Sequence, residues 1–431
     1  MARPARILSL PGIALAWLLA LPLALPLAFA PVSKADAANL SATESGSRVK
    51  IRFATFNASL SGASDGELRE RLGSRRDDQL RRVAGIIQAV RPDVLLINEF
   101  DWDPDGKAHE DFIHNYLIRG QHGHSGIRYR YHFLAPVNTG IASGRDLDRD
   151  GQIGGPGDAW GFGRFPGQYG MLVLSRYPIV SREARTFREL RWRDMPGALL
   201  PAQTDGTPWY SDDTLALFPL SSKSHWDLPI WTRAGRIHLI AAHPTPPVFD
   251  GEEKRNSRRN FDEIRLLADH VSGDTERSAY IVDDAGVQGG LPADALFVVA
   301  GDFNADPVDG DSHPGAIAQL LNHPRIQAQP VPGSDGGAES AHRMGGSNLA
   351  HRGDPRHDTA VFSDPPGNLR VDYVLPSNGM RVVDSGVYWP LSSEADAELL
   401  DASDHRLVWI DVELPVQTPS ARRSLRDSVQ R

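Results

Sequence analysis

Six short segments of the chain place polar side chains directly after apolar runs, and their residue types suit one kind of chemistry. The rim of a packed sheet gathers the ends of several strands, and rigid strands hold such side chains in place. Carboxylate, amide and imidazole groups that meet there form a hard-oxygen metal site with donors for a phosphate group. The side chains in question are Asn57, Glu99, His243, Asp302, Asn304, Asp372, Asp404 and His405.

Each of these residues also has an ordinary structural interpretation. Asn57 would cap a turn, and His243 would be a hydrogen-bonded core histidine. Glu99 would end a strand in solvent, and Asp372 would pair with Arg370 on its own strand. The two remaining segments would be an Asx turn and a helix cap. Because all of these interpretations would have to hold together, one shared site is the favoured hypothesis.

Hydrophobic spacing predicts the elements that must position these side chains. Residues 49–57 alternate as a half-buried strand does, and residues 93–98 read as a strand buried on both faces. Residues 77–90 have apolar side chains at helical spacing, and Pro92 ends that helix. Further strands are expected at 170–175, 237–242, 296–300, 371–376 and 407–413, with a second helix at 262–271.

Long segments rich in glycine and proline separate these elements. Structureless loops of such length are often functional, and here they cover residues 101–168, 187–232, 272–294 and 325–368. We therefore expect one catalytic domain at 48–414 with large insertions. The basic, polar segment at 415–431 is expected to be a disordered tail.

The order and spacing of the six segments resemble those of the endonuclease/exonuclease/phosphatase superfamily, the metal-dependent phosphoesterases similar to deoxyribonuclease I. The resemblance covers residues 49–414. It implies a four-layered α/β sandwich, in which two mostly antiparallel mixed β-sheets pack face to face with helices outside. It also implies hydrolysis of a phosphate ester or diester.

Metal-binding roles follow from the same resemblance. Glu99 matches the family's main metal-binding glutamate, and Asn57 matches the asparagine beside it. Asp404 belongs to the closing aspartate–histidine pair and is expected at the metal as well. The expected cation is Mg²⁺ or Mn²⁺, held by one or two carboxylates with positions left for substrate and water. Whether one or two ions act stays open.

The remaining residues match the family's catalytic positions. Asp302 corresponds to the aspartate that positions or deprotonates water, and Asn304 to the amide that steadies a phosphate oxygen. His243 matches a phosphate-contacting histidine, and Asp372 the aspartate of an Asp-Tyr motif. His405 acts on the nucleophile or on the scissile phosphate. The general base is Asp302 or His405.

One position departs from the family pattern. The family usually has a tyrosine or an acidic residue just before the strand that begins near Met171. Both Gln168 and Tyr169 compete for that place here, so we assign neither a catalytic role.

A second ion site is suggested by Asp146, Asp148 and Asp150, which are followed by Gly151. Carboxylates at alternate positions before a glycine form the first half of a calcium loop. The twelfth position holds Gly157 instead of glutamate, so a complete EF-hand is not expected. The alternatives are a structural Ca²⁺ site and an acidic, solvated loop.

The start of the chain has the order of a secretory signal peptide, expected at residues 1–37. Arg3 and Arg6 precede an apolar run over residues 7–30, and a small-residue cleavage site ends at Ala37. Prolines interrupt the run, whereas a membrane-spanning helix needs about 20 unbroken apolar residues. We expect a secreted or periplasmic protein without a membrane span in the mature chain.

The net charge of the chain bears on which class of substrate the protein acts on. The formal net charge is −9 and there is no cysteine. An acidic surface repels nucleic acid at long range, which weakens the case for a nuclease acting on long polymers. The open substrates are a nucleic acid, a phospholipid head group, an inositol phosphate and another small ester. The competing hypothesis is a non-catalytic binding module, which would require a substituted site position, and none is substituted.

Overall fold

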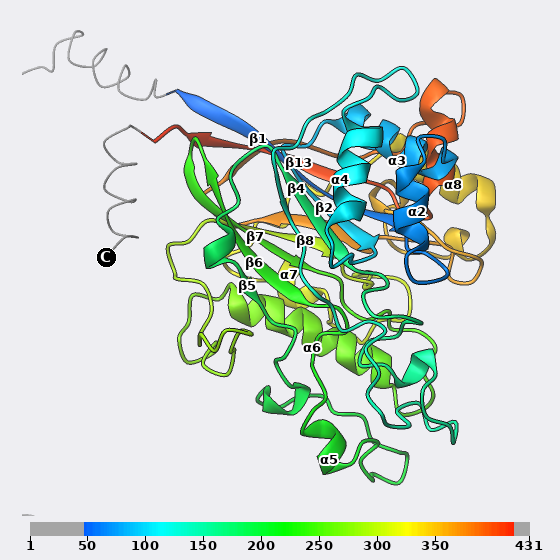
Figure 1. Cartoon of the computed structure of the whole chain (residues 1–431), viewed down its shortest axis with the longest axis vertical. Coiled ribbons are helices and arrows are strands. Elements are labelled where there is room, and N and C mark those ends of the chain that lie inside the picture. The colour runs from blue at the N-terminus through cyan, green and yellow to red at the C-terminus, as the bar shows by residue number, and fades with distance from the viewer. Residues whose placement is uncertain (1–46, 418–431) are drawn as a thin grey trace, which may run out of the picture. The chain divides into compact units, whose positions relative to one another are not determined.

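The computed structural model describes residues 47–417, and its core is a pair of β-sheets (Figure 1). The first sheet has the strand order β12-β13-β1-β2-β4-β3, and the second has the order β11-β8-β7-β6-β5. The first comprises β1 (Arg48–Leu60), β2 (Val94–Phe100), β3 (Tyr131–Phe133), β4 (Met171–Ser175), β12 (Arg381–Val387) and β13 (Val408–Pro415). The second comprises β5 (Arg185–Thr186), β6 (His225–Thr232), β7 (Gly235–Ala242), β8 (Phe297–Asp302) and β11 (Asp372–Pro376).

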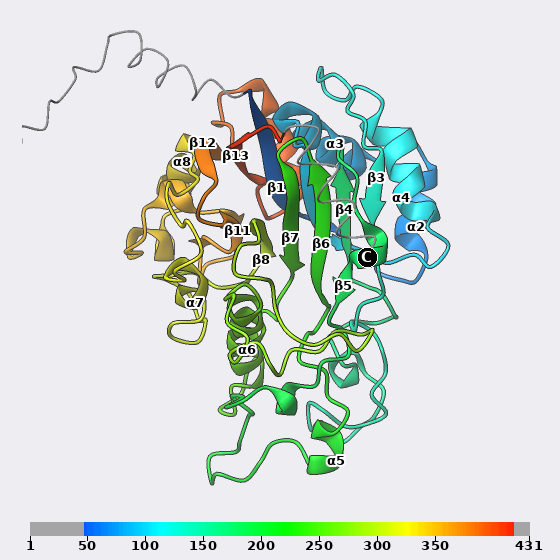
Figure 2. The same cartoon turned by 90° about the vertical axis from the view of Figure 1, so that its left-hand side faces the viewer.

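Helices cover the outer faces of the sheets. Figure 2 shows α2 and α4 to the right of the strands and α7 and α8 to their left. The α-helices are α2 (Glu67–Gly73), α3 (Asp78–Val90), α4 (Lys107–Phe112), α5 (Asp212–Leu215), α6 (Arg255–His270), α7 (Ala318–Leu321) and α8 (Asp335–Met344). A π-helical turn, η1 (Ile113–Leu117), continues α4. A small hairpin joins β9 (Ala360–Val361) to β10 (Asn368–Leu369).

Six short 3₁₀ helices lie in the connections. They are η2 (Pro156–Asp158), η3 (Ser181–Glu183), η4 (Trp192–Asp194), η5 (Gly346–Leu349), η6 (Pro355–His357) and η7 (Ala395–Ala402) among the described residues.

The alternation along β1 explains the layering. Ile51 and Phe53 pack into a core shared by the two sheets, whereas Ala54 and Phe56 pack into the core beneath α3 and α4. Successive strand residues point to opposite faces, so one strand contributes to both cores. A third core lies between the second sheet and α6. Helices, sheet, sheet and helices form the predicted four-layered α/β sandwich, with one parallel strand pair in each sheet.

The helix predicted at 77–90 is confirmed as α3, and its end signals are local. The Asp77 side chain accepts a hydrogen bond from the Leu80 amide at 2.9 Å, which satisfies an amide of the first turn. At the other end Arg91 has a φ of 58°, and Pro92 follows. The second predicted helix begins earlier than expected, because α6 starts at Arg255.

Three of the long segments predicted as loops contain regular structure, and residues 101–168 contain α4 and β3. The other two are the less expected cases. Residues 187–232 end in β6, which pairs with β7 along its whole length, although Pro229 interrupts its apolar pattern. Only Trp226 and Asp227 of β6 pair with β5, and Pro229 lies beyond them. The β5–β6 pairing therefore does not need the backbone N–H that proline lacks. Residues 325–368 contain α8. All three predictions were wrong, because pairing and packing with distant residues formed these elements.

The insertions between the strands have a hydrophobic core of their own. Phe187, Trp192, Tyr210 and Phe218 pack together against Leu266 of α6. The indole N–H of Trp192 donates to a carboxylate oxygen of Asp262 on α6 at 2.7 Å. The insertion is therefore an ordered wall beside the second sheet.

The expected signal peptide at 1–37 lies outside the described residues, as does all of the expected tail beyond residue 417. Across residues 47–417, the structure has no helix with the length and apolar character needed to cross a bilayer.

We predict that acid destabilises the fold through buried neutral histidines. The ring of His109 in α4 lies 4.0 Å from that of His132 in β3, centroid to centroid. Burial, aided by His132, lowers the pKa of His109 to about 4, whereas an unfolded chain has a histidine pKa of about 6.5. The unfolded chain therefore binds more protons between these values, so the free energy of unfolding falls as the pH falls from about 6.5 to about 4.

Urea unfolding of His109→Gln at pH 7.5 and pH 4.5, in EDTA, measures this effect. We expect a smaller loss of unfolding free energy at acid pH than in the parent chain. His114→Gln is the matched control, because His114 is exposed one turn further along. An equal acid loss in both variants would contradict the assignment to His109.

Candidate active site

The site lies where the carboxyl ends of the two parallel strand pairs meet. In the first sheet β1 runs parallel to β2 and brings Asn57 opposite Asn98, next to Glu99. In the second sheet β7 runs parallel to β8, which ends at Asp302, and His243 follows β7. The antiparallel strand β11 begins with Asp372, directly opposite Asp302. The sheets thus gather side chains from five segments at one rim.

Asp302 is at the centre of this group. Its Oδ2 accepts a hydrogen bond from the Asn57 amide at 3.0 Å. The same oxygen lies 3.4 Å from Nε2 of His243 and 3.7 Å from Nε2 of His405. Its backbone N–H donates to the side-chain oxygen of Asn98 at 3.3 Å. One carboxylate oxygen is therefore shared by three side chains from both sheets.

His405 is held by a buried aspartate. Its Nδ1 lies 2.9 Å from Oδ2 of Asp372. The hydroxyl of Thr359 donates to that same oxygen at 2.8 Å and accepts the amide protons of Val371 and Asp372, at 3.0 Å each. The bonds of Thr359 fix the aspartate, and the aspartate fixes the orientation of the imidazole ring.

The charges of the group follow from burial and from each other. Burial alone would lower the pKa of His405, but the carboxylates of Asp372 and Asp302 outweigh it and raise that pKa well above its usual value. Burial would likewise raise the pKa of Asp302, and the charge of His405 with hydrogen bonds from His243 and Asn57 holds it below its usual range. Burial raises the pKa of Asp372. At neutral pH, His405 is a cation and Asp302 is an anion.

His243 behaves differently from His405. Burial, followed by the nearby charge of Lys223, lowers the pKa of His243 to about 4, so its ring is neutral. Its Nε2 faces Asp302, and its buried Nδ1 has no hydrogen-bond partner within residues 47–417. A neutral imidazole in this position offers one free nitrogen to a ligand.

Glu99 faces the same group from β2. Burial raises the pKa of Glu99, while His405, the Asn57 amide and Lys223 act in the opposite direction. The backbone of Glu99 has a φ of 59°, and Tyr169 and Asn304 also have left-handed backbones, with φ values of 57° and 51°. Residues other than glycine rarely adopt this conformation, which is typical of functional sites.

Two other predicted residues lie at the edge of the group. The Asn304 amide group donates to the carbonyl oxygen of Pro244 at 3.2 Å, and its backbone N–H donates to Oδ1 of Asp302 at 2.9 Å. Asp404 is exposed, and its Oδ1 accepts a hydrogen bond from Ser59 at 3.0 Å. Its charge contributes to the raised pKa of His405. Within the described residues, neither side chain forms a hydrogen bond or ion pair with the imidazole of His405.

Gly301 explains why the two central strands of the second sheet approach so closely. A Cβ at this position would lie 2.0 Å from the carbonyl oxygen of Ala242. Real side chains do not fit in that space, so only glycine allows Asp302 to reach its place beside His243.

Sequence reasoning missed Lys223, Thr359 and Glu263. Lys223 lies in the segment predicted as loop, and burial lowers its pKa against the attraction of Glu263, Glu99 and Asp302. Glu263, on α6, accepts the backbone amide protons of Ser222 and Thr245, at 2.7 Å and 2.6 Å. No local pattern marks these residues, because each acts through a partner on another segment.

The donor set of the site fits a divalent cation. Glu99 and Asn57 offer hard oxygen ligands, and the raised pKa of Glu99 means that its charge lacks compensation when ionised. The oxygens of Asp302 and Asp372 and a nitrogen of His405 also lie within 4.8 Å of one another. The proton on His405 already compensates these two carboxylates. Glu99 is therefore the less well compensated of these carboxylates.

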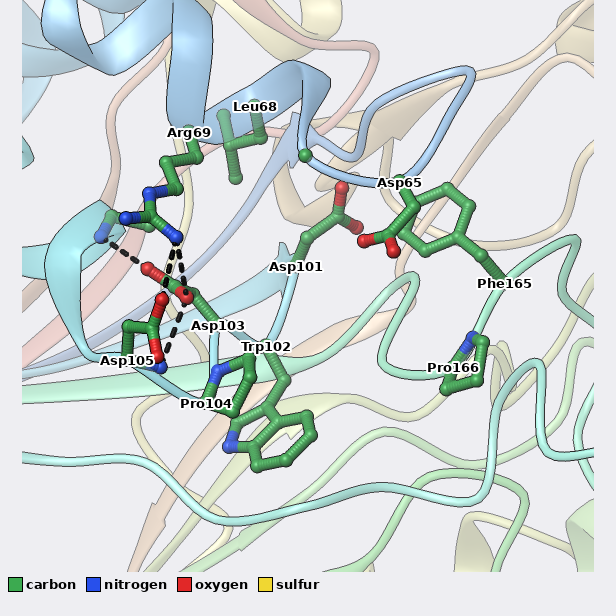
Figure 3. Close-up of a pocket in the computed structure, with 12 residues that line it drawn as sticks. Asp65, Leu68, Arg69, Asp101, Trp102, Asp103, Pro104, Asp105, Phe165 and Pro166 are labelled. Carbon is green, nitrogen blue, oxygen red and sulfur yellow. Dashed lines mark hydrogen bonds and ion pairs between the residues drawn. The ribbon is translucent and has the colours of Figure 1, made fainter.

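A separate cavity of about 380 Å³ lies on the other side of the end of β2 (Figure 3). The side chains of Asp65 and Asp101 point toward one another in it, and Arg69 is paired with Asp103 and Asp105. Asp101 accepts the amide protons of Gly62 at 2.7 Å and Tyr169 at 3.0 Å, and burial raises its pKa to about 7. An acidic cavity repels phosphate, so Asp101 has a structural role in joining β2 to the Tyr169 loop.

The expected calcium loop gathers three carboxylates. Asp146, Asp148 and Asp158 bring one oxygen each within 4.8 Å of the others. The Asp150 side chain instead accepts the amide proton of Gln152 at 2.7 Å. The third carboxylate of this group is therefore Asp158, which lies in η2 beyond the expected loop.

The fold and the acidic, histidine-containing rim define the class of the protein: it is a divalent-metal-dependent phosphoesterase, a hydrolase. The model of the Endonuclease/Exonuclease/phosphatase family matches residues 54–405, and the chain belongs to that family. No curated protein matches the sequence.

Several solved structures are similar to the chain at low sequence identity. An endonuclease/exonuclease/phosphatase from Beutenbergia cavernae is 16% identical, with a TM-score of 0.47 over 85% of this chain and 72% of that one. Sphingomyelinase C from Streptomyces griseocarneus is 16% identical, with a TM-score of 0.40 over 84% and 99% of the two chains. TDP2 from Caenorhabditis elegans is 13% identical, with a TM-score of 0.41 over 88% and 81%.

We predict that His405 stays protonated at pH 7.5 in the metal-free protein because two carboxylates face it. Asp372→Asn removes one of them, so the pKa of His405 should fall. The ¹⁵N chemical shifts of the histidine rings, followed from pH 6 to pH 10 in EDTA, measure this change. Asp384→Asn is the control, because Asp384 is exposed on β12. A His405 resonance that is neutral at pH 7.5 in the parent chain would contradict the charge assignment.

Proposed function

We propose that this protein is an exported hydrolase that cleaves a phosphodiester or phosphate monoester by attack of water on phosphorus. The observation that carries the proposal is the shared oxygen of Asp302, with Asn57, His243 and cationic His405 around it. The Asp302 carboxylate, which would orient water, thus lies beside the His405 cation, which would face the negative charge that develops in the transition state. The signal-like start of the chain supports export to the periplasm or the medium.

We propose that Glu99 and Asn57 hold Mg²⁺ or Mn²⁺, with Asp404 on the exposed side. When bound, such a cation neutralises charge on phosphate oxygens and lowers the pKa of water. Both carboxylates suit a hard cation, and the incomplete charge compensation of Glu99 supports its place as the main ligand.

Asp302 is the residue that we assign to the water. Its carboxylate is ionised, buried and fixed from three sides, so it accepts a hydrogen bond from water in one orientation. His405 is already protonated and therefore does not act as the first base. We therefore propose Asp302, and not His405, as the group that orients water and accepts its proton.

His405 is assigned to the phosphate. Its Nε2 proton points to the side of Asp302, where it stabilises negative charge in the transition state and donates to the leaving oxygen. Asp372 keeps the ring oriented and cationic. The amide of Asn304 suits a contact with a phosphate oxygen, whereas the free Nδ1 of neutral His243 suits a hydrogen-bond donor on the substrate.

The first test is hydrolysis with and without EDTA. The substrates are bis(p-nitrophenyl) phosphate, p-nitrophenyl phosphate, plasmid DNA, sphingomyelin and an inositol phosphate. The proposal expects turnover that EDTA abolishes and Mg²⁺ or Mn²⁺ restores. A binding module that keeps the fold predicts no EDTA-sensitive turnover of any of them.

Glu99→Gln separates metal binding from folding. The neutral amide removes a buried, poorly compensated charge, so the metal-free variant should be at least as stable as the parent chain. We expect the rise in Tm on addition of MgCl₂ to disappear, and kcat/KM on bis(p-nitrophenyl) phosphate to fall by at least about 10²-fold. Glu70→Gln, on the exposed face of α2, is the control. A full Mg²⁺ shift in the Glu99 variant would refute the ligand assignment.

We also propose that Asp146, Asp148 and Asp158 hold a structural Ca²⁺. Oδ1 of Asp146 is buried and has no hydrogen-bond partner within the described residues, which supports a cation there. Differential scanning fluorimetry with CaCl₂ should show a rise in Tm that Asp158→Asn loses. Asp150→Asn should keep the rise, because Asp150 is exposed and lies outside the group. Equal behaviour of the two variants would rule out this set of ligands.

A further inference from the structure

A second cavity, of about 550 Å³, opens directly from the active site. Glu99, Lys223 and His243 form part of its wall. Its remaining wall comes from the insertions and from the start of α6, with Phe162, Tyr210, Phe218, Val248 and Phe249 among the lining residues. A cavity of this size accommodates a substantial organic group. The inference about which part of the substrate fills this cavity rests on the proposed function.

The mouth of the cavity displays two phenylalanines to solvent. Phe249 is 90% exposed and Phe162 is 62% exposed. Phe249 also has a φ of 58°, which is unusual for a bulky residue. Large apolar side chains displayed at the mouth of a cavity indicate a surface that binds apolar groups.

The loop that carries Phe249 is held in place from α6. The carboxylate of Asp250 accepts the amide protons of Asn256 and Ser257, at 2.7 Å and 2.8 Å. The side chain of Asn256 donates to the carbonyl oxygen of Val248 at 2.8 Å. These bonds fix Phe249 in its exposed position before any ligand arrives.

The two arginines in the cavity wall are committed to protein partners. Arg255 is paired with Glu253 at 2.6 Å. Arg259 donates to the carbonyl oxygens of Leu220, Pro219 and Trp160. These guanidinium groups therefore do not form the continuous basic track that a nucleic acid backbone requires.

The polar end of the cavity has free groups that suit one anion. Lys223 is buried, and its ammonium makes no ion pair or side-chain hydrogen bond with the part of the chain that is described. The hydroxyls of Ser222 and Thr245, on either side of Glu263, are buried without hydrogen-bond partners among residues 47–417. The carboxylates of Glu263, Glu99 and Asp302 attract the Lys223 ammonium, whereas the two hydroxyls are costly to bury unless a ligand bonds to them.

We propose that the substrate is a phosphate ester of an amphiphile, a phospholipid-type molecule, and that this cavity binds its apolar substituent. Lys223 meets a phosphate oxygen at the polar end, and Phe162 and Phe249 cover the aliphatic part at the mouth. Water adds to phosphorus, the ester P–O bond breaks, and the leaving oxygen takes a proton. A polynucleotide is disfavoured by the net charge of −9 and by the committed arginines.

Alkyl p-nitrophenyl phosphates with methyl, butyl and octyl groups test the proposal, with thymidine 5′-(p-nitrophenyl phosphate) for comparison. Each yields p-nitrophenol and the matching monoester. Burial of a methylene group corresponds to a factor of up to about four, so kcat/KM should be about 10²-fold or more higher for the octyl than for the methyl ester. The thymidine ester should be slower than the octyl ester. Equal rates across chain length, or a faster thymidine ester, would overturn the proposal.

Variants locate the effect in the cavity. Phe162→Ser and Phe249→Ser should each lower the ratio of kcat/KM between the octyl and methyl esters about 5-fold to 10-fold, because each substitution leaves part of the octyl group exposed to water. Phe249→Leu, which keeps an apolar side chain, should retain most of the preference for the octyl ester. Leu349→Ser is the control, because Leu349 is 73% exposed and does not line the cavity. Unchanged ratios in both serine variants would contradict the assignment of the mouth.

Equilibrium binding separates this proposal from the proposed function. Octyl phosphate and methyl phosphate are titrated into the full chain in EDTA and followed by calorimetry. Tighter binding of octyl phosphate in EDTA, together with no hydrolysis of any of the esters in MgCl₂ or MnCl₂, would support the cavity and refute the catalytic proposal. Hydrolysis of all esters at equal rates, with equal binding of both phosphates, would support catalysis and refute the cavity's role.

Discussion

The parallel pairing of two strands in each sheet is the constraint on which the site depends. β1 runs with β2, and β7 runs with β8, so four carboxyl ends of strands meet at one rim. Every other strand pair in the two sheets is antiparallel, which lets β11 start at that rim. Because each sheet is buried between a helical layer and the other sheet, the backbone beneath these side chains has little freedom. The hydrophobic cores on the faces of the two sheets therefore make the site rigid.

Burial then determines the charges at the rim. A dry site with three carboxylates is unfavourable unless positive groups compensate them. His405 compensates Asp302 and Asp372, and it carries its proton for that reason. Glu99 is less well compensated, and this deficit is what a divalent cation relieves. The buried carboxylates thus call for two kinds of positive group at the rim, the protonated His405 and the divalent cation that we propose beside Glu99.

The insertions have a function beyond connection. They pack around their own aromatic core against α6, and they build the wall of the larger cavity. The three-carboxylate group at Asp146, Asp148 and Asp158 lies in the same wall, since Asp148 also lines the cavity. We therefore propose that the rim of the sheets carries out catalysis and that the insertions select the substrate.

The sequence by itself determined the features whose cause is local. The alternation of β1 and the helical spacing of α3 predicted these elements, and the polar residues that follow each apolar run carried the family resemblance that implied the fold and the roles of Asn57, Glu99, Asp302 and His405. Only the tertiary structure brought in Lys223 and Thr359, replaced Asp150 by Asp158, and formed β6 around Pro229. These depend on contacts between segments far apart in the chain, and neither spacing nor propensity encodes such contacts. The tertiary structure also decided the charge of His405, because that charge arises from burial beside two carboxylates, Asp302 and Asp372, on other strands.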